Sequence, residues 1–383
     1  MRTAQPEHSP YCDKNRTMNY LISIRIAVLL CGLASISHAQ IVPFTQFYNA
    51  PSLLNSSLTG LSAGTSIQLI NRNHWIAADN AYTTSGAVAE FNVQNRQHSA
   101  GVGFFILNDA FGEALFESST IGRTSVGLSA SHHAAIGGEN KPSKYISGGM
   151  SLRLVQTSVN WDDFIFSDQI HAIFGATKAM DTRTFPPEAS YTNPAIHAGA
   201  NYIHKGLLTP IWNKLADDDY FEIGLSFGSL ITVRNSIYNY EIFERKRLTT
   251  HFRYELVSNS RFESNNRVGV TGRFDRIYGN GSELALNSYL IRRSILVGTG
   301  YQATLTSHTL GENIHRMNVT AGYVLGNDEN NATNKICMTY NYSGAINGIS
   351  NSRLGYNHEI SIIMLLSEKG FKKTQGVRQD GFF

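Results

Sequence analysis

The sequence is poor in residues that stabilise or identify several common classes of protein. It has 3 cysteines in 383 residues, and only Cys337 lies outside the N-terminal leader described below. An internal disulfide is therefore excluded, and with it a disulfide-stapled secreted scaffold. Charged residues make up 16% of the chain, below the usual level of about a quarter. No apolar run beyond the leader has the length of a membrane-spanning helix, which excludes a helical membrane protein.

The charge balance argues against a nucleic-acid partner. The formal net charge is +3, and the basic cluster that stands out is KGFKK at 369–373. Such a weak and dispersed charge does not supply the phosphate contacts that nucleic-acid binding needs. The chain is instead rich in glycine, with 33 Gly beside 9 Pro, and in aromatic residues, at 11%. This composition favours β structure over disorder.

The N-terminus has the features of a signal peptide. An apolar run at 26–34 follows a basic residue, and it is too short to span a membrane. Ser37 and Ala39 provide the small residues at −3 and −1 of a cleavage site before Gln40. We therefore expect residues 1–39 to be a signal peptide and the mature protein to be exported.

Two further interpretations of the leader are open. Met18 is an alternative start, because the first seventeen residues make an unusually long leader. Acylation of Cys31 would make the chain a lipoprotein, but the residue directly before it is Leu30, where a small residue is expected. A conventional signal peptide is the favoured interpretation.

Short runs of alternating side chains make up most of the mature chain. In 220–231, for example, large apolar residues alternate with Glu, Gly and Ser, as in a strand with one apolar face. About fourteen such runs occur, at 65–75, 82–93, 98–109, 124–137, 144–159, 194–206, 220–231, 248–258, 265–278, 282–291, 293–305, 314–326, 335–344 and 356–366. Their length and even number predict an all-β fold, a transmembrane outer-membrane β-barrel of about 14 antiparallel strands over 65–366.

The composition of the non-apolar face separates this barrel from its main alternative. A soluble β-sandwich, or two tandem β domains, would also alternate, but its polar face would carry Lys, Glu and Thr for contact with water. Here that face is rich in Gly, Ser, Ala and Asn. Small and neutral side chains fit a crowded or constricted barrel interior, so the barrel is favoured.

Two long interruptions separate the expected strands. They lie at 161–193 and 204–219, and the first contains Pro186–Pro187. Loops of this length in a barrel belong on the extracellular side or fold into the lumen, and such loops often carry function. A basic tail at 367–383 follows the last expected strand.

The segment at 40–64 has the pattern of neither a strand nor a helix. It contains PFTQFYNAPSLLNSSLTG at 43–60. Asn49, Pro51 and Asn55 favour turns stabilised by local side-chain hydrogen bonds, and the aromatic and leucine side chains between them can anchor a compact segment. We expect an irregular, plug-like segment in the lumen or at the periplasmic rim. An ordered tail that packs only for stability is the alternative.

No catalytic, cofactor or metal site is predicted. His132 and His133 are adjacent on an expected strand, so they point to opposite faces and cannot bind one metal ion. Asp162–Asp163 and Asp217–Asp219 lack the spacing of a calcium loop, and solvated acidic turns explain them better. No G-x-S-x-G nucleophile elbow occurs. Cys337 lies in an expected strand and is interpreted as a buried small residue.

The opening motifs of the mature chain resemble those of a known family. The stretch at 43–60, RNHW at 72–75 and YTTSGAVAEF at 82–91 resemble the start of the PorP/SprF family, outer-membrane proteins of the Bacteroidetes type IX secretion and gliding machinery. The matching residues are Phe44, Gln46, Phe47, Asn49, Pro51, Leu54, Asn55, Gly60, Arg72, Asn73 and Trp75. The chain departs from the family pattern at Ala50, Ser56 and His74.

The resemblance implies a non-enzymatic outer-membrane component of type IX secretion or gliding. Its expected partners are the lipid bilayer, a secreted adhesin or other cargo with a type IX C-terminal signal domain, and a periplasmic peptidoglycan-binding lipoprotein. The matching residues are then candidates for partner binding. A passive porin or hydrophobic-solute channel is the second hypothesis, and it predicts ion conductance. A barrel enzyme is the third, and it predicts a Ser or Asp beside a His at the lumen or rim.

Overall fold

The computed structural model describes most of the expected mature chain. The described residues are 44–62, 64–74, 82–94, 98–111, 121–136, 143–160, 170–171, 175–176, 188–207, 218–230, 235–237, 240–242, 246–260, 263–278, 281–305, 313–326, 335–346 and 356–366. The predicted signal peptide at 1–39, the acidic pair Asp162–Asp163 and the basic tail at 367–383 lie outside these residues. In the part described, no helix combines the length and the apolarity that a membrane crossing requires.

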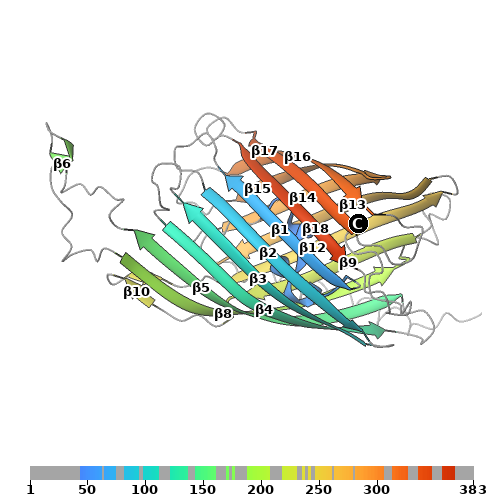
Figure 1. The fold of residues 1–383 in the computed structure, drawn as a ribbon, viewed down its shortest axis with the longest axis horizontal. Coiled ribbons are helices and arrows are strands. Elements are labelled where there is room, and N and C mark those ends of the chain that lie inside the picture. The colour runs from blue at the N-terminus through green and yellow to red at the C-terminus, as the bar shows by residue number, and fades with distance from the viewer. Residues whose placement is uncertain are drawn as a thin grey trace, which may run out of the picture.

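Fourteen strands form one closed barrel (Figure 1). They are β1 (Thr65–His74), β2 (Tyr82–Gln94), β3 (His98–Phe111), β4 (Ile121–Ile136), β5 (Lys144–Asn160), β8 (Glu188–Lys205), β9 (Asp218–Gly228), β12 (Arg247–Ser260), β13 (Glu263–Ile277), β14 (Gly281–Arg292), β15 (Ile295–Leu305), β16 (Ile314–Leu325), β17 (Lys335–Ala345) and β18 (Asn357–Leu366). Each strand pairs antiparallel with the next, and β1 pairs with β18 to close the barrel, from Thr65 opposite Leu366 to Asn73 opposite His358. The predicted strand number and pairing are confirmed.

Four short strands form hairpins outside the barrel sheet. β6 (Ile170–His171) pairs with β7 (Gly175–Ala176), between β5 and β8. β10 (Asn235–Ile237) pairs with β11 (Tyr240–Ile242), between β9 and β12. Both hairpins lie at the same end of the barrel, on the left of Figure 1.

The two faces of the barrel wall differ as a membrane protein requires. On β4, Leu128 is 59% exposed and its neighbour Ser129 is 3% exposed; on β16, Val319 is 62% exposed and Thr320 is 3% exposed. Apolar side chains therefore cover the outside and polar ones face the inside. A soluble sandwich has the opposite arrangement, because its apolar faces pack against each other, so the alternative fold is excluded.

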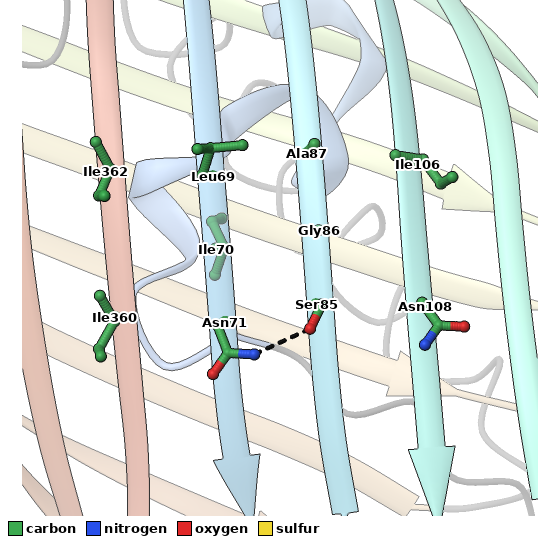
Figure 2. Close-up of a pocket in the computed structure, with 10 residues that line it drawn as sticks. All are labelled: Leu69, Ile70, Asn71, Ser85, Gly86, Ala87, Ile106, Asn108, Ile360 and Ile362. Atoms are coloured by element: carbon green, nitrogen blue, oxygen red, sulfur yellow. Dashed lines mark hydrogen bonds between the residues drawn. The ribbon is translucent and has the colours of Figure 1, made fainter. Parts of the chain in front are cut away.

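Figure 2 shows this outer surface over β18, β1, β2 and β3. Leu69, Ile106, Ile360 and Ile362 border a shallow apolar groove of about 370 Å³, whose floor includes the small residues of β2. The groove ends in polar side chains: Asn71 Nδ2 donates to Ser85 Oγ at 2.9 Å, and Asn108 lies beside them. The outer surface thus changes from apolar to polar along these strands, as at the edge of a membrane-facing belt.

Alternate connections lie at opposite ends of an antiparallel barrel. We call the end where β1 finishes the distal mouth, and the end where β1 begins and β18 finishes the terminal mouth. Two residues separate β12 from β13, and two separate β14 from β15, at the terminal mouth, whereas both extra hairpins belong to distal connections. Short turns are typical of the periplasmic side and long loops of the extracellular side, so the distal mouth faces outward.

This geometry corrects two expectations about the interruptions. β8 begins at Glu188, so the first interruption is shorter than the predicted 161–193. β5 ends at the distal mouth, whereas β8 ends at the terminal mouth, so the interruption predicted at 204–219 opens on the opposite side. Only one of the two is on the extracellular side. The predicted acidic turn at Asp217–Asp219 is also wrong for Asp219, which lies in β9, is 1% exposed and packs beside Tyr254.

Candidate functional site inside the barrel

Residues 44–62 lie inside the barrel, where they form three short helical turns. These are η1 (Phe47–Asn49), α2 (Pro51–Leu54) and η2 (Ser56–Leu58). Local backbone hydrogen bonds hold them: Asn49 N–H donates to the Gln46 carbonyl at 2.9 Å, and Asn55 N–H to the Pro51 carbonyl at 2.9 Å. Pro51 is the first residue of α2, a position where the missing N–H costs nothing. We call residues 44–62 the inner segment.

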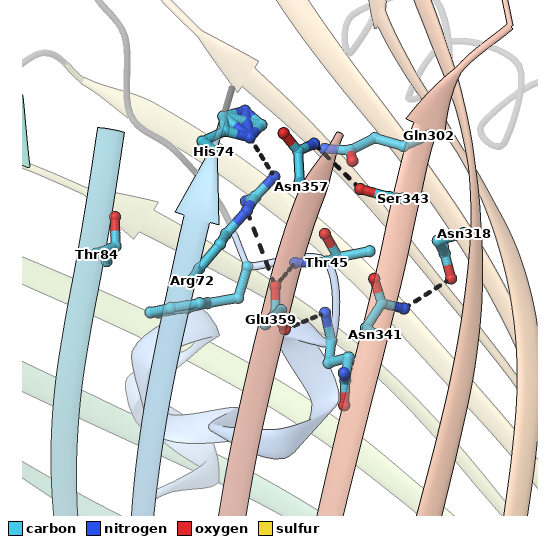
Figure 3. A network of polar contacts seen from close by, with 12 residues as sticks. Thr45, Arg72, His74, Thr84, Gln302, Asn318, Asn341, Ser343, Asn357 and Glu359 are labelled. Carbon is cyan, nitrogen blue, oxygen red and sulfur yellow. Dashed lines mark hydrogen bonds and ion pairs between the residues drawn. The ribbon is translucent and has the colours of Figure 1, made fainter. Parts of the chain in front are cut away.

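A carboxylate of the last strand anchors the start of the inner segment. Glu359 on β18 accepts the backbone N–H of Thr45 at 2.7 Å and that of Gln46 at 2.8 Å. Arg72 on β1 forms an ion pair with the same carboxylate, with 3.9 Å between Nε and Oε2. Figure 3 shows these contacts above the helical turns. Because hydrogen bonds to a charged group are the strong ones, Glu359 fixes the segment across the seam between β1 and β18.

The barrel wall also binds the backbone carbonyls of this region. Arg273 Nη1 on β13 donates to the Phe44 carbonyl at 3.0 Å. Asn287 Nδ2 on β14 donates to the Thr45 carbonyl at 3.2 Å. Both polar groups of the Thr45 backbone are therefore paired with the wall, as buried backbone requires.

A side-chain network continues the contact toward β17 and β18. Asn49 Nδ2 donates to Thr339 Oγ1 at 3.0 Å and to Ser361 Oγ at 2.5 Å. Thr339 in turn donates to the Gln46 side chain. Asn49, Gln46, Thr339 and Ser361 are all buried, so the two amides of the inner segment are matched to hydroxyl groups of the wall.

Apolar packing holds the next residues. Phe47 and Tyr48 join a buried cluster with Tyr289, Leu296 and Cys337, which belong to three strands of the wall. The rings of Tyr48 and Tyr289 stack with their centroids 5.7 Å apart. Cys337 is a free thiol, 3% exposed, so its interpretation as a buried small residue is confirmed.

Asn55 connects the inner segment to the opposite side of the barrel. Its Oδ1 accepts the backbone N–H of Ser57 at 3.0 Å and so caps η2. Its Nδ2 lies 3.2 Å from the Ala200 carbonyl on β8 and 3.0 Å from His251 Nε2 on β12. The turn expected at Asn55 is thus present, and the same amide docks the turn on the wall.

Glycines of the wall make room for the end of the inner segment. A Cβ at Gly101, Gly149 or Gly199 would overlap the Thr59 carbonyl, the Ser56 carbonyl or the Asn55 side chain respectively. These three glycines lie on β3, β5 and β8, which together with β4 form one continuous part of the wall. The backbone of the inner segment therefore approaches the wall more closely than any other residue type at these positions would allow.

Gly60 completes this contact. Its φ of +61° lies in the left-handed region that favours glycine, and a Cβ there would overlap the Gly101 backbone. Glu90 Oε2 on β2 accepts the Gly60 N–H at 3.0 Å. The chain then turns into β1.

The interior carries more charge than the sequence pattern suggested. Arg273 pairs with Asp275 at 2.7 Å and with Glu283, and Arg253 pairs with Glu255. These side chains are buried, so each charge needs the partner it has. Strand alternation could have placed these charged residues inside, because they occupy the inward positions of their strands. Which residues pair with each other depends on strand register and could not be read from the sequence.

The structure places ten of the eleven family-motif residues. Phe44, Gln46, Phe47, Asn49, Pro51, Leu54, Asn55 and Gly60 belong to the inner segment, and Arg72 faces it from β1. Asn73 points to the other face of β1, where its Oδ1 accepts from Thr83 Oγ1 at 3.1 Å, and it does not join the others. Trp75 lies outside the described residues.

The histidine pair behaves as expected from strand geometry. His132 is exposed on the outer face of β4, whereas His133 is 1% exposed inside. His133 Nδ1 lies 2.7 Å from Ser147 Oγ, and its Nε2 lies 3.0 Å from the Thr59 carbonyl. Sequence reasoning missed this second role, in which His133 supports the inner segment. Within the described ranges, no three His, Cys, Asp or Glu side chains come together as a metal site.

Comparison with known protein families identifies the chain. A family model described as "Type IX secretion system membrane protein PorP/SprF" matches residues 36–364. The chain belongs to the PorP/SprF family. Together with the closed barrel and its apolar outer face, this membership makes the protein an integral outer-membrane β-barrel with a secretion-related role. The resemblance noted in the sequence is confirmed.

The search of solved structures found several proteins that are similar to this PorP/SprF protein. The β domain of the Bordetella autotransporter BrkA is 11% identical with a TM-score of 0.40, covering 80% of this chain and 99% of that one. A Pseudomonas aeruginosa FadL homologue is 9% identical with a TM-score of 0.40, covering 79% and 89%. Acinetobacter baumannii Omp33 is 11% identical with a TM-score of 0.35, covering 81% and 100%. The comparison with curated proteins gave no match.

Proposed function

We propose that this PorP/SprF protein is a non-enzymatic docking component of the type IX secretion or gliding machinery. It holds a secreted adhesin or other cargo that carries a type IX C-terminal signal domain, and it contacts a periplasmic peptidoglycan-binding lipoprotein. The observation that carries the proposal is the inner segment, which binds walls on opposite sides of the barrel and occupies its interior. A barrel whose interior is crossed by its own chain suits a docking platform better than an open channel.

The closed sheet directs docking to the two mouths. A barrel of fourteen paired strands offers no edge for a partner strand. At the distal mouth, however, β8 pairs with β5 from Glu188 onward but with β9 only from Ala198 onward. β5 and β8 thus extend the wall beyond β9 on one side (Figure 1). We assign cargo to this extended side and the periplasmic lipoprotein to the terminal mouth.

A capture experiment tests the proposal. The tagged mature chain is purified from its native envelope in mild detergent, and co-purified proteins are identified by mass spectrometry. We expect a large secreted protein with a C-terminal signal domain, or a peptidoglycan-binding lipoprotein. The variant Asn49→Ala should reduce this capture while the barrel still inserts. Asn71→Ala, at an outward position of β1, is the matched control and should leave capture unchanged.

The competing function gives a different result. A passive porin predicts that the barrel purifies alone and conducts ions in a planar bilayer. That outcome would replace the docking proposal. Loss of insertion in Asn49→Ala, with normal capture by the molecules that do insert, would make the inner segment purely structural.

A further inference from the structure

Arg316 stands apart from the other buried arginines of the interior. It lies on β16, opposite Gln302 on β15, and is 8% exposed, whereas the next residue, Met317, is 59% exposed on the outer face. The Arg316 side chain therefore points into the barrel. Among the described residues, it forms no hydrogen bond and no ion pair.

Two acidic groups of this region, Glu283 and Glu359, are already engaged. Glu283 acts on Arg316 electrostatically, but its Oε1 accepts from Arg273 and, at 2.5 Å, from Gln302 Nε2. The two carboxylate oxygens of Glu359 accept the backbone N–H groups of the inner segment. A largely buried guanidinium is stabilised by an anionic partner, so Arg316 is available to a negatively charged ligand.

A second arginine and a histidine share this region. Arg316 lies within electrostatic reach of Arg72 and of His74. Arg72 Nη2 lies 3.4 Å from His74 Nδ1. Figure 3 shows Arg72 and His74 beyond the helical turns, toward the end of β1 and on the same side as Asn357 and Gln302. The group therefore lies between the inner segment and the distal mouth.

Gln302 adds a complementary acceptor. Its Nε2 is bound to Glu283, but its Oε1 has no hydrogen-bond partner among the described residues. A buried carbonyl oxygen without a hydrogen bond is unfavourable, so a ligand that donates a hydrogen bond to it would be stabilised there. The site thus has an unpaired guanidinium and an unpaired acceptor on adjacent strands, at directly opposite register positions.

We propose that Arg316, Arg72 and His74 form an oxyanion-binding site in the distal half of the barrel interior. Its ligand is a carboxylate or phosphate group that bears a neighbouring hydroxyl or N–H. The planar guanidinium of Arg316 matches both oxyanions through paired hydrogen bonds, and Gln302 Oε1 accepts from the neighbouring donor. The site does not depend on the docking function, because it needs only the folded barrel and an open distal mouth.

The test uses the detergent-purified mature chain and three probes. Inorganic phosphate, glycolate and acetate are each titrated at constant ionic strength against chloride, and the rise in Tm is recorded. We expect saturable stabilisation by phosphate or by glycolate, with acetate weaker than glycolate because it lacks the hydroxyl. Preference for phosphate or for glycolate distinguishes the two ligand sources. The proposal is overturned if chloride raises the Tm as much as the probes do, or if no probe raises the Tm.

Variants locate the site. Arg316→Gln should weaken binding about tenfold, the loss of one charge-assisted hydrogen bond. Arg276→Gln is the control, because Arg276 is half-buried on β13 and donates to Ser282 Oγ at 3.0 Å; it should bind as the unmodified chain does. Unchanged binding in Arg316→Gln places the ligand elsewhere and overturns the proposal. If that variant fails to fold, Arg316→Lys should show the weakened binding, because lysine keeps the charge but cannot form the paired hydrogen bonds of a guanidinium.

Discussion

The backbone carbonyl of Ser56 occupies the space in which any side chain at Gly149 would begin. The two residues lie 93 positions apart in sequence, on the inner segment and on β5. A contact this close between two backbones shows that the wall and the segment fit each other as parts of one packed unit. The inner segment is therefore held as tightly as a core element, although it lies inside a barrel.

The first prediction follows from this contact. Gly149→Ala should lower the free energy of unfolding by about 1–3 kcal/mol, because the new methyl group must displace the Ser56 backbone. Gly148→Ala is the matched control on the same strand, since a Cβ there meets nothing within 4 Å. Urea unfolding, followed by the heat-dependent migration of the barrel on gels, measures both. Equal stability of the two variants would show that the inner segment can shift away from the new methyl group at no cost in stability.

The second prediction concerns the anchor on β18. Glu359→Gln should lower the free energy of unfolding by about 3 kcal/mol, because it removes the buried carboxylate that pairs with Arg72. It should also weaken the hydrogen bonds to Thr45 and Gln46. Hydrogen exchange at those two amides should accelerate. His358→Gln, at the adjacent outward position, serves as the control. Slow exchange at both amides in Glu359→Gln would mean that other contacts suffice to hold the segment.

The third prediction uses Cys337 as a reporter of packing. In the native chain this thiol should resist a water-soluble maleimide, because it is 3% exposed within the cluster of Phe47 and Tyr48. Phe47→Ala removes a ring from that cluster and should raise the labelling rate at least several-fold. Labelling is followed by mass spectrometry. Rapid labelling of the unmodified chain would contradict the packing described here.

The fourth prediction concerns the barrel as a pore. The unmodified chain should conduct ions weakly in a planar bilayer, because its inner segment crosses the interior from one wall to the opposite one. Removal of residues 44–58 should raise the conductance severalfold, since a barrel of fourteen strands leaves room for water once it is empty. Equal conductance of the two chains would show that the segment does not control the passage.

Strand alternation was enough to predict the barrel. The pattern at 220–231 placed Glu222 inside and Ile223 outside, and the structure has them so. Alternation reports only which face a side chain occupies, and here that single fact recurs fourteen times. The family motif likewise pointed to the residues of the inner segment, because their turn chemistry is local.

What the sequence did not reveal depends on distant pairing. Nothing local marks Glu359 as the partner of Thr45, because their contact exists only when β18 lies beside β1. The same holds for His133, whose contact with Thr59 depends on the position of the whole segment. Asp219 was misjudged because an acidic run resembles a solvated turn until strand pairing buries it.

The contact between Thr45 and Glu359 spans 314 positions, most of the 383-residue sequence, and this has a consequence for biogenesis. The anchor on β18 does not exist until the last strand has been delivered to the membrane. A finished wall of hydrogen-bonded strands has no gap through which the inner segment could enter from the side. The segment is therefore enclosed as the sheet rolls up, and the step that joins the first strand to the last also seals the interior.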